Sequence, residues 1–142
     1  MDIPHDAVLL RIFTSVDDRY GAEAALYHAI VEKAREMHLA GATVLQGPLG
    51  YGRSGRLRGA HLLAPDERPI VIEICDAEEK INAFLPLLDE MMESGLVTLE
   101  RAQVLQYGRK RSPYLERLKD SLLHHLHREP APHHDEITPP RA

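Results

Sequence analysis

The sequence predicts an α+β protein, built as a ferredoxin-like βαββαβ sandwich with an extra C-terminal helix. Residues 8–14 and 69–75 alternate between apolar and other side chains, as half-buried strands do. Apolar residues recur at helical spacing over residues 22–39 and 76–93. With one further strand after each helix, the order strand–helix–strand–strand–helix–strand is that of two split βαβ units.

In the first half of the domain, a strand over residues 8–14 leads through a loop into a helix over residues 22–39. Asp18 is expected to cap this helix or to complement its dipole. Gly41 stands where a left-handed C-terminal cap belongs, and a strand over residues 42–49 follows. The apolar stripe of the helix runs through Leu26, Ile30, Lys33 and Met37.

Residues 50–67 connect the second and third predicted strands. This segment is rich in glycine and arginine and shows no clear periodicity. Compact domains rarely keep so long a connection unless it is functional or disordered. Glycine allows close approach of the backbone to a ligand, and arginine suits phosphate or carboxylate. We therefore expect a flexible arm on a rigid core, which favours a binding or signalling protein over an enzyme.

The second half of the domain begins with the strand over residues 69–75. Asp76, with Glu79 three residues later, forms a capping-box variant at the start of the next helix. Pro86 is expected to kink that helix. The fourth strand, over residues 98–107, loses its alternation near residues 100–101, which predicts a bulge or a late start.

The right-handed crossovers place both helices on one face of the sheet. The opposite face is expected to be half apolar, which is unfavourable in a monomer, so we expect burial against further copies of the chain. The side chains predicted for this face are Leu9, Phe13, Val71 and Cys75, with Arg11 and Glu73.

The chain divides into three parts. Residues 1–107 form the sandwich domain. Residues 108–127 form a basic linker and an amphipathic helix, in which Ser112 and Pro113 give a good start signal. Residues 128–142 hold four prolines in a polar context and are expected to be disordered.

The composition excludes several classes of protein. The net charge of −5 argues against general nucleic-acid binding, which needs a basic surface. The N-terminal apolar run is too short for a signal peptide, and no run approaches the ~20 residues of a membrane span. We therefore expect a cytoplasmic protein. The one cysteine, Cys75, excludes an intrachain disulfide and reads as a small buried hydrophobe.

Two clusters are candidate sites for a small anion. Gly47, Gly50 and Gly52 can shape a nest of backbone amides, although glycines at a strand end can also serve only to allow positive φ angles. Arg53 follows them directly. The basic run at residues 109–111 would attract phosphate, or simply keep a linker soluble. Farther along the arm, the sequence places two arginines that are expected to face a partner protein, Arg56 and Arg58.

Other readings of single residues remain open. His124 and His127 lie one helical turn apart and could share a metal ion, although an exposed helix end explains them more simply. Tyr107 and Tyr114 flank the basic run and suit either stacking on an adenine ring or packing against the last helix. No nucleophile, base and orienting group occur at telling spacing, so we expect no catalysis and no required cofactor.

Short segments within residues 8–107 occur in the same order as in a known protein family. They are residues 10–13, 18–20, 29–36, 39–44, 50–52, 71–74, 79–81, 84–86 and 88–89. Through them the chain resembles the bacterial PII-like family known as "domain of unknown function 190". The helix and tail after residue 108 lie outside this resemblance.

The resemblance implies a compact homotrimer that binds small effectors, often adenine nucleotides, in clefts between subunits. It also implies that the loop after the second strand docks on a target such as a transporter or an enzyme. Residues 50–53 look similar to the base of that loop, and Arg109 and Arg111 resemble a basic pair that contacts ligand phosphates. The tyrosine that classical PII proteins modify in the loop has no match here. The glycine-rich connection before the fourth strand is shortened to residues 94–97.

The sequence thus predicts a non-enzymatic, homotrimeric PII-like signalling protein. Its expected effector is ATP, ADP, AMP or a cyclic nucleotide, and its expected target is another protein rather than a nucleic acid or the membrane interior. A metal-responsive trimer using His124 and His127, or an interaction module without an effector, are the alternatives. The predicted ligand-binding residues are Gly47, Gly50, Tyr51, Gly52, Arg53, Arg109, Lys110 and Arg111.

Overall fold

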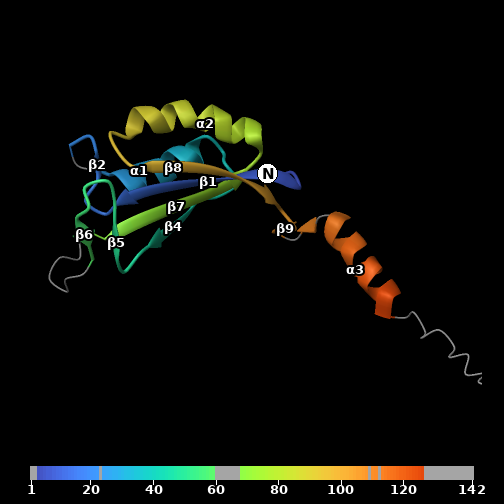
Figure 1. The fold of residues 1–142 in the computed structure, drawn as a ribbon. Coiled ribbons are helices and arrows are strands. Elements are labelled where there is room, and N and C mark those ends of the chain that lie inside the picture. Colours follow the sequence, from blue (N-terminus) through green and yellow to red (C-terminus); the bar gives the residue numbers. More distant parts are fainter. Residues whose placement is uncertain (1–2, 23, 60–67, 109, 112, 127–142) are drawn as a thin grey trace, which may run out of the picture.

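A computed structural model describes residues 3–22, 24–59, 68–108, 110–111 and 113–126 of the chain (Figure 1). The helices are α1 (Leu26–Glu36), α2 (Glu78–Met91) and α3 (Pro113–Leu126). The longer strands are β1 (Asp6–Ser15), β4 (Thr43–Gln46), β7 (Pro69–Asp76) and β8 (Leu96–Gln103). The two-residue strands are β2 (Arg19–Tyr20), β3 (Ala24–Ala25), β5 (Gly50–Tyr51), β6 (Leu57–Arg58), β9 (Gln106–Tyr107) and β10 (Lys110–Arg111).

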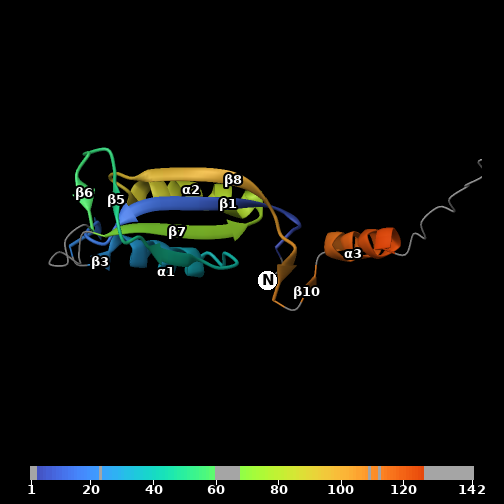
Figure 2. The same cartoon turned by 60° about the horizontal axis from the view of Figure 1, so that its bottom comes forward.

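The four longer strands form one antiparallel sheet in the order β4–β7–β1–β8. Strands that are distant in sequence are therefore neighbours, with β1 in the interior and β4 and β8 at the edges. This is the predicted βαββαβ sandwich, and α3 agrees with the predicted C-terminal helix. Figures 1 and 2 show α3 projecting away from the sandwich.

The core lies between the sheet and the helices α1 and α2. Leu10, Ile12 and Ile72 are fully buried on the helix side of the sheet, and Phe84 of α2 meets them. On α1 the buried residues are Leu26, Ile30 and Ala34. Ala34 lies in the stripe where the sequence suggested Lys33, whose amine pairs instead with Glu36 at 2.7 Å. An aliphatic core is what a chain without tryptophan must build.

The other face of the sheet has no helix over it (Figure 2). The strand register aligns Leu45, Val71, Phe13 and Leu96 in one row across all four strands, which we call the apolar row. Its two end residues are 48% and 56% exposed. Beside this row, Arg11 pairs with Glu73 at 2.7 Å and with Glu100 at 2.5 Å. We call this surface the open face, and it is half apolar as the alternation predicted.

Cys75 lies on the open face and is only half-buried, so the prediction of a buried cysteine is wrong for the single chain. The reason is that no helix covers its side of β7. Desolvation nonetheless raises the pKa of the thiol, and the negative charge of Asp76 raises it further. The thiol therefore stays protonated at neutral pH, which does not favour a nucleophilic role.

Several predicted boundaries are wrong. The first helix begins at Leu26 rather than residue 22, because residues 19–25 include the β2–β3 ribbon. Asp18 is not its cap: Ala25 holds that position without a side-chain bond. Likewise, Ala77 rather than Asp76 is the N-cap of α2. The fourth strand begins at Leu96 and pairs with β1 without a bulge. Its alternation is weak because β8 is an edge strand whose Glu100 pairs with Arg11.

Candidate functional site

The end of the sheet near Ser15 carries the β5–β6 hairpin, and we call it the arm end. The hairpin pairs Tyr51 with Leu57 and closes through a turn in which the Gly55 N–H donates to the Gly52 carbonyl at 2.9 Å. The first part of the predicted arm is therefore a hairpin, while residues 60–67 lie outside the described residues. Two-residue strands are too short for any periodicity to reveal them.

The arm is joined to the sheet at a tightly packed base. Gly59 has a φ of +86°, and a Cβ there would lie 2.3 Å from the Pro48 carbonyl oxygen, so only glycine fits. A Cβ on Gly47 would approach the ring of Pro69 to 2.9 Å, and one on Gly50 to 3.1 Å.

The predicted reason for the arm glycines was only partly right. Gly47, Gly50 and Gly52 do not have positive φ angles; close packing against Pro69 explains the first two. The Gly47 N–H already donates to the Pro69 carbonyl at 2.8 Å. Ligand binding by these three glycines stays a prediction, and the Gly47 amide would have to leave its partner to join a nest.

Arg58 holds the hairpin against the turn after β1. Its guanidinium donates to Asp17 Oδ1 at 3.1 Å, and Ser15 Oγ donates to the same oxygen. Partial burial raises the pKa of the Asp17 carboxyl, but the Ser15 hydrogen bond and the charges of Arg58 and Arg56 outweigh it, so the net pKa lies below its usual range. Docking of a partner by Arg58 stays a prediction, and its guanidinium is engaged within the chain.

Asp17→Asn should loosen the hairpin without unfolding the domain. We expect at least threefold faster hydrogen exchange at the Leu57 and Arg58 amides, with a change in global stability below about 1 kcal/mol, because the pair is partly exposed. Since the folded-state pKa lies below the unfolded value of about 3.9, the contribution of the Asp17 carboxylate is present at neutral pH and lost as the pH falls through the folded-state pKa.

The matched control is Glu32→Gln, which removes an exposed carboxylate of α1 far from the arm. It should leave exchange at residues 57 and 58 unchanged. Equal exchange in the wild type and Asp17→Asn would show that the pair does not hold the hairpin.

Beyond the base, the hairpin presents its side chains to solvent. Tyr51 is 76% exposed, and Leu57 is half exposed opposite it. Arg53 and Arg56 are exposed in and after the turn. An apolar and basic hairpin tip suits contact with an acidic or mixed protein surface, which agrees with the predicted role of the arm.

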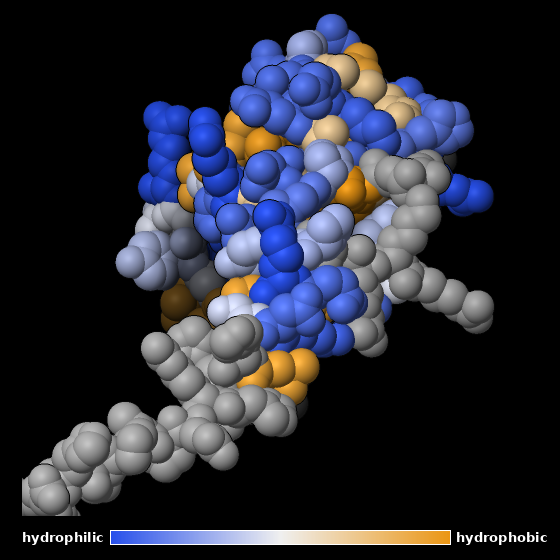
Figure 3. All heavy atoms as spheres, turned by 90° about the vertical axis from the view of Figure 1, so that its right-hand side faces the viewer, coloured by the Kyte–Doolittle hydropathy of each residue, from blue (hydrophilic) through white to orange (hydrophobic). Residues whose placement is uncertain are grey.

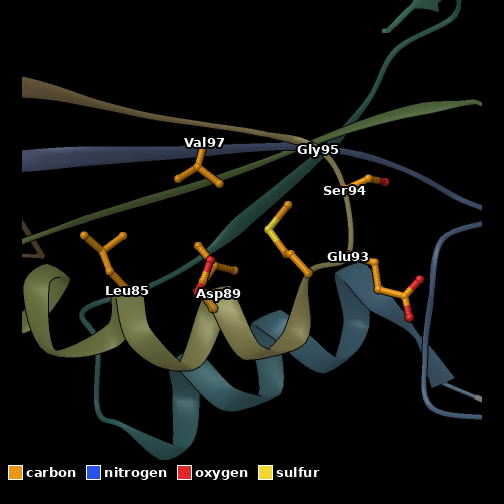
Figure 4. Close-up of a pocket in the computed structure, with 8 residues that line it drawn as sticks. Leu85, Asp89, Glu93, Ser94, Gly95 and Val97 are labelled. Carbon is orange, nitrogen blue, oxygen red and sulfur yellow. The ribbon is translucent and has the colours of Figure 1, made fainter. Parts of the chain in front are cut away.

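The loop between α2 and β8 lies at the same end of the sheet. Gly95 has a φ of +134°, and a Cβ there would lie 2.8 Å from the Phe13 carbonyl oxygen, so the loop rests directly on β1. Ser94 and Gly95 close one end of a pocket of about 370 Å³ between α2 and β8 (Figure 4). Sequence reasoning missed this pocket, because its lining comes from packing of a helix against an edge strand.

The opposite end of the sheet carries the β9–β10 hairpin, and we call it the hairpin end. Tyr107 Oη donates to the Ala40 carbonyl at 2.7 Å, and the Ala40 N–H donates to Asp76 Oδ2 at 2.8 Å. Lys80 Nζ lies 3.3 Å from the same Asp76 oxygen. A chain of hydrogen bonds therefore ties the hairpin to the start of α2. Tyr107 is thus engaged within the chain rather than packed on α3.

Predicted site residues at this end are only partly described. Lys110 and Arg111 form β10 and pair with Tyr107 and Gln106, but their side chains lie outside the described residues, as does Arg109. Figure 3, which views this end, shows a mostly hydrophilic surface broken by small hydrophobic areas. Tyr114 stacks on His5 with ring centroids 5.0 Å apart.

The metal alternative cannot be placed. The side chain of His124 and all of His127 lie outside the described residues. Within the described part of the chain, no cluster of three histidine, cysteine or acidic side chains could hold a metal ion.

One chain does not bring the two predicted clusters together. The arm base adjoins the Ser15 end of β1, where the Val16 N–H bonds to the Arg68 carbonyl. The basic hairpin adjoins its Asp6 end, where the Val104 N–H bonds to the His5 carbonyl. Ten residues of extended strand separate these ends by about 30 Å. A site that uses both clusters therefore requires a second copy of the chain.

The sandwich and its two loop ends define the class to which the protein belongs, the PII-like fold. The model of family DUF190 ("Uncharacterized ACR") matches residues 7–104, and the chain belongs to this family. A UPF0166 protein of Aquifex aeolicus is 40% identical over 98 residues, covering 68% of this chain and 91% of the relative. A UPF0166 protein of Methanocaldococcus jannaschii is 31% identical over 99 residues, covering 69% and 91%.

Solved structures confirm the fold. A PII-like signalling protein of Thermus thermophilus, described as putative in its own title, has a TM-score of 0.54 at 20% identity, covering 73% of this chain and 93% of its own. CPII, a nitrogen regulatory PII-like protein of Thiomonas intermedia, has a TM-score of 0.52 at 20% identity, covering 70% and 88%. That CPII structure contains ADP, AMP and bicarbonate. In the described part of our chain, no helix is long and apolar enough to cross a membrane.

Proposed function

We propose that the protein is a non-enzymatic PII-like regulator that works as a homotrimer in the cytoplasm. Its open faces pack together, and a small anionic effector binds where the arm end of one copy meets the hairpin end of the next. The separation of the two predicted clusters by the length of β1 carries this proposal, because only assembly can join them.

The effector we propose is an adenine nucleotide. Arginine and lysine near residues 53 and 109–111 suit phosphate, and their charges stand out in a chain of net charge −5. The bound ADP and AMP of CPII add support at the level of the fold. Effector binding would order the arm, and the exposed hairpin tip with Arg53 and Arg56 would then meet a partner protein.

Titration calorimetry with ATP, ADP, AMP and cyclic nucleotides tests this proposal. We expect at least one of them to bind the wild type, and Lys110→Ala combined with Arg111→Ala to weaken that binding at least tenfold, because charged hydrogen bonds are worth about 1.5–3 kcal/mol each.

The control for this experiment is Arg35→Ala, which removes an exposed positive charge from the last turn of α1. It should bind as tightly as the wild type. No binding across the panel would overturn the nucleotide, and equal losses in both variants would show general electrostatics rather than a site.

A further inference from the structure

The pocket between α2 and β8 has the form of an open apolar groove with an acidic rim. In Figure 4, Val97 of β8 points toward α2 and Leu85 of α2 points toward the strand. Asp89 and Glu93 are exposed residues of the rim. Val97 remains 39% exposed, because β8 is an edge strand and α2 does not cover its whole width. The full lining is Leu85, Leu88, Asp89, Met92, Glu93, Ser94, Gly95 and Val97.

Helix α3 has a complementary surface. Leu115, Leu118 and Leu122 follow one another at the spacing of one helix face, and we call them the leucine stripe. The last two are 39% and 63% exposed. Lys119 borders the stripe, four residues after its first leucine and three before its last, whereas Arg117 lies on the opposite side of the helix.

A membrane surface is a poorer occupant for this stripe than protein. The charged side chains of α3 are Glu116, Arg117, Lys119 and Asp120, which sum to zero, so anionic lipids would not attract it. A second α3 is also a poor match, because two antiparallel stripes would bring their bordering lysines together.

The groove of the same chain is out of reach. The groove lies at the start of β8, whereas α3 follows the end of this eight-residue strand, about 25 Å away. The β9–β10 hairpin intervenes, and Tyr107 ties it to Ala40. Figures 1 and 2 accordingly show α3 pointing away from the sandwich.

We propose that α3 of one copy occupies the α2–β8 groove of a second copy. The leucine stripe lies on the apolar floor, and Lys119 faces the rim carboxylates of Asp89 and Glu93. This inference rests on the proposed function, since the proposed assembly places the hairpin end of one copy beside the arm end of the next. Docked there, α3 would cover the Ser94–Gly95 end of the groove next to the arm base.

Hydrogen exchange of the full-length protein tests the inference, because an isolated 14-residue helix is marginal in water and would exchange quickly. We expect the α3 amides of the wild type to be protected. Lys119→Glu and Asp89→Lys should each speed their exchange at least tenfold, and the double variant should regain at least a third of the lost protection. Arg117→Glu is the matched control and should leave exchange unchanged.

Mixed assemblies distinguish docking between copies from docking within one. In co-expressed Lys119→Glu and Asp89→Lys chains, docking between copies restores complementary pairs, so part of the α3 protection should return. Docking within a chain would give no recovery.

Light scattering separates failure of this inference from failure of the proposed function. A trimer whose α3 exchanges like a free peptide, or whose protection ignores both charge changes, overturns the inference alone. A monomeric wild type overturns the assembly and the inference together.

Discussion

Val71→Asp is expected to give a folded monomer. Val71 lies in the apolar row, between Leu45 and Phe13. In the single chain it is half-buried, so a carboxylate there can still reach water and the domain should fold. Between packed open faces the same carboxylate would be desolvated without a partner, which costs several kcal/mol. The mass by light scattering should fall from about three times to once the chain mass of 16.0 kDa.

Val71→Thr is the control, because threonine has nearly the shape of valine and carries no charge. We expect this variant to remain a trimer at micromolar concentration. A Val71→Asp trimer with unchanged dissociation would mean that the copies meet elsewhere, and the proposed cleft would then be lost.

Asp76→Ala is expected to destabilise the fold by about 3 kcal/mol and to lower the melting temperature by about 10 °C. Asp76 is fully buried, yet its carboxylate accepts from the Ala40 N–H at 2.8 Å and the Ala77 N–H at 2.7 Å. Removing it leaves two buried backbone donors without this acceptor and takes the carboxylate from Lys80. Urea unfolding followed by circular dichroism measures the loss.

Two comparisons sharpen this result. Glu32→Ala removes an exposed carboxylate and should change stability by no more than about 0.5 kcal/mol. Tyr107→Phe should speed exchange in the β9–β10 hairpin while costing far less stability than Asp76→Ala, since it removes one half-buried hydrogen bond at the far end of the same chain. Equal stability of Asp76→Ala and the wild type would show that the buried carboxylate does not hold these loops.

The sandwich was predictable because its signals are periodic and local. The isoleucines of β7 alternate strictly, and their buried side is the side the alternation indicated. The buried stripe of α2 through Ile81, Phe84 and Leu88 likewise follows helical spacing. The open face was predictable for the same reason, since burying every second residue of β1 and β7 leaves the others uncovered.

The contacts that organise the two ends were not predictable. Arg58 meets Asp17 across 41 positions, and Tyr107 meets Ala40 across 67. No local pattern marks such pairs. Asp76 was recognised as polar punctuation at the start of a helix, but its burial and its bond to Ala40 depend on how the loop after α1 packs. The groove beside β8 is likewise a product of tertiary packing.

The position of Gly95 has a thermodynamic consequence. Its loop closes the α2–β8 groove on one side and rests on the carbonyl of Phe13, a member of the apolar row, on the other. Any occupant of the groove that shifts this loop must therefore also displace the backbone of β1. Linkage then makes the effect mutual: whatever free energy such an occupant adds to the joining of three sheets, that joining returns to the occupant's affinity in equal measure.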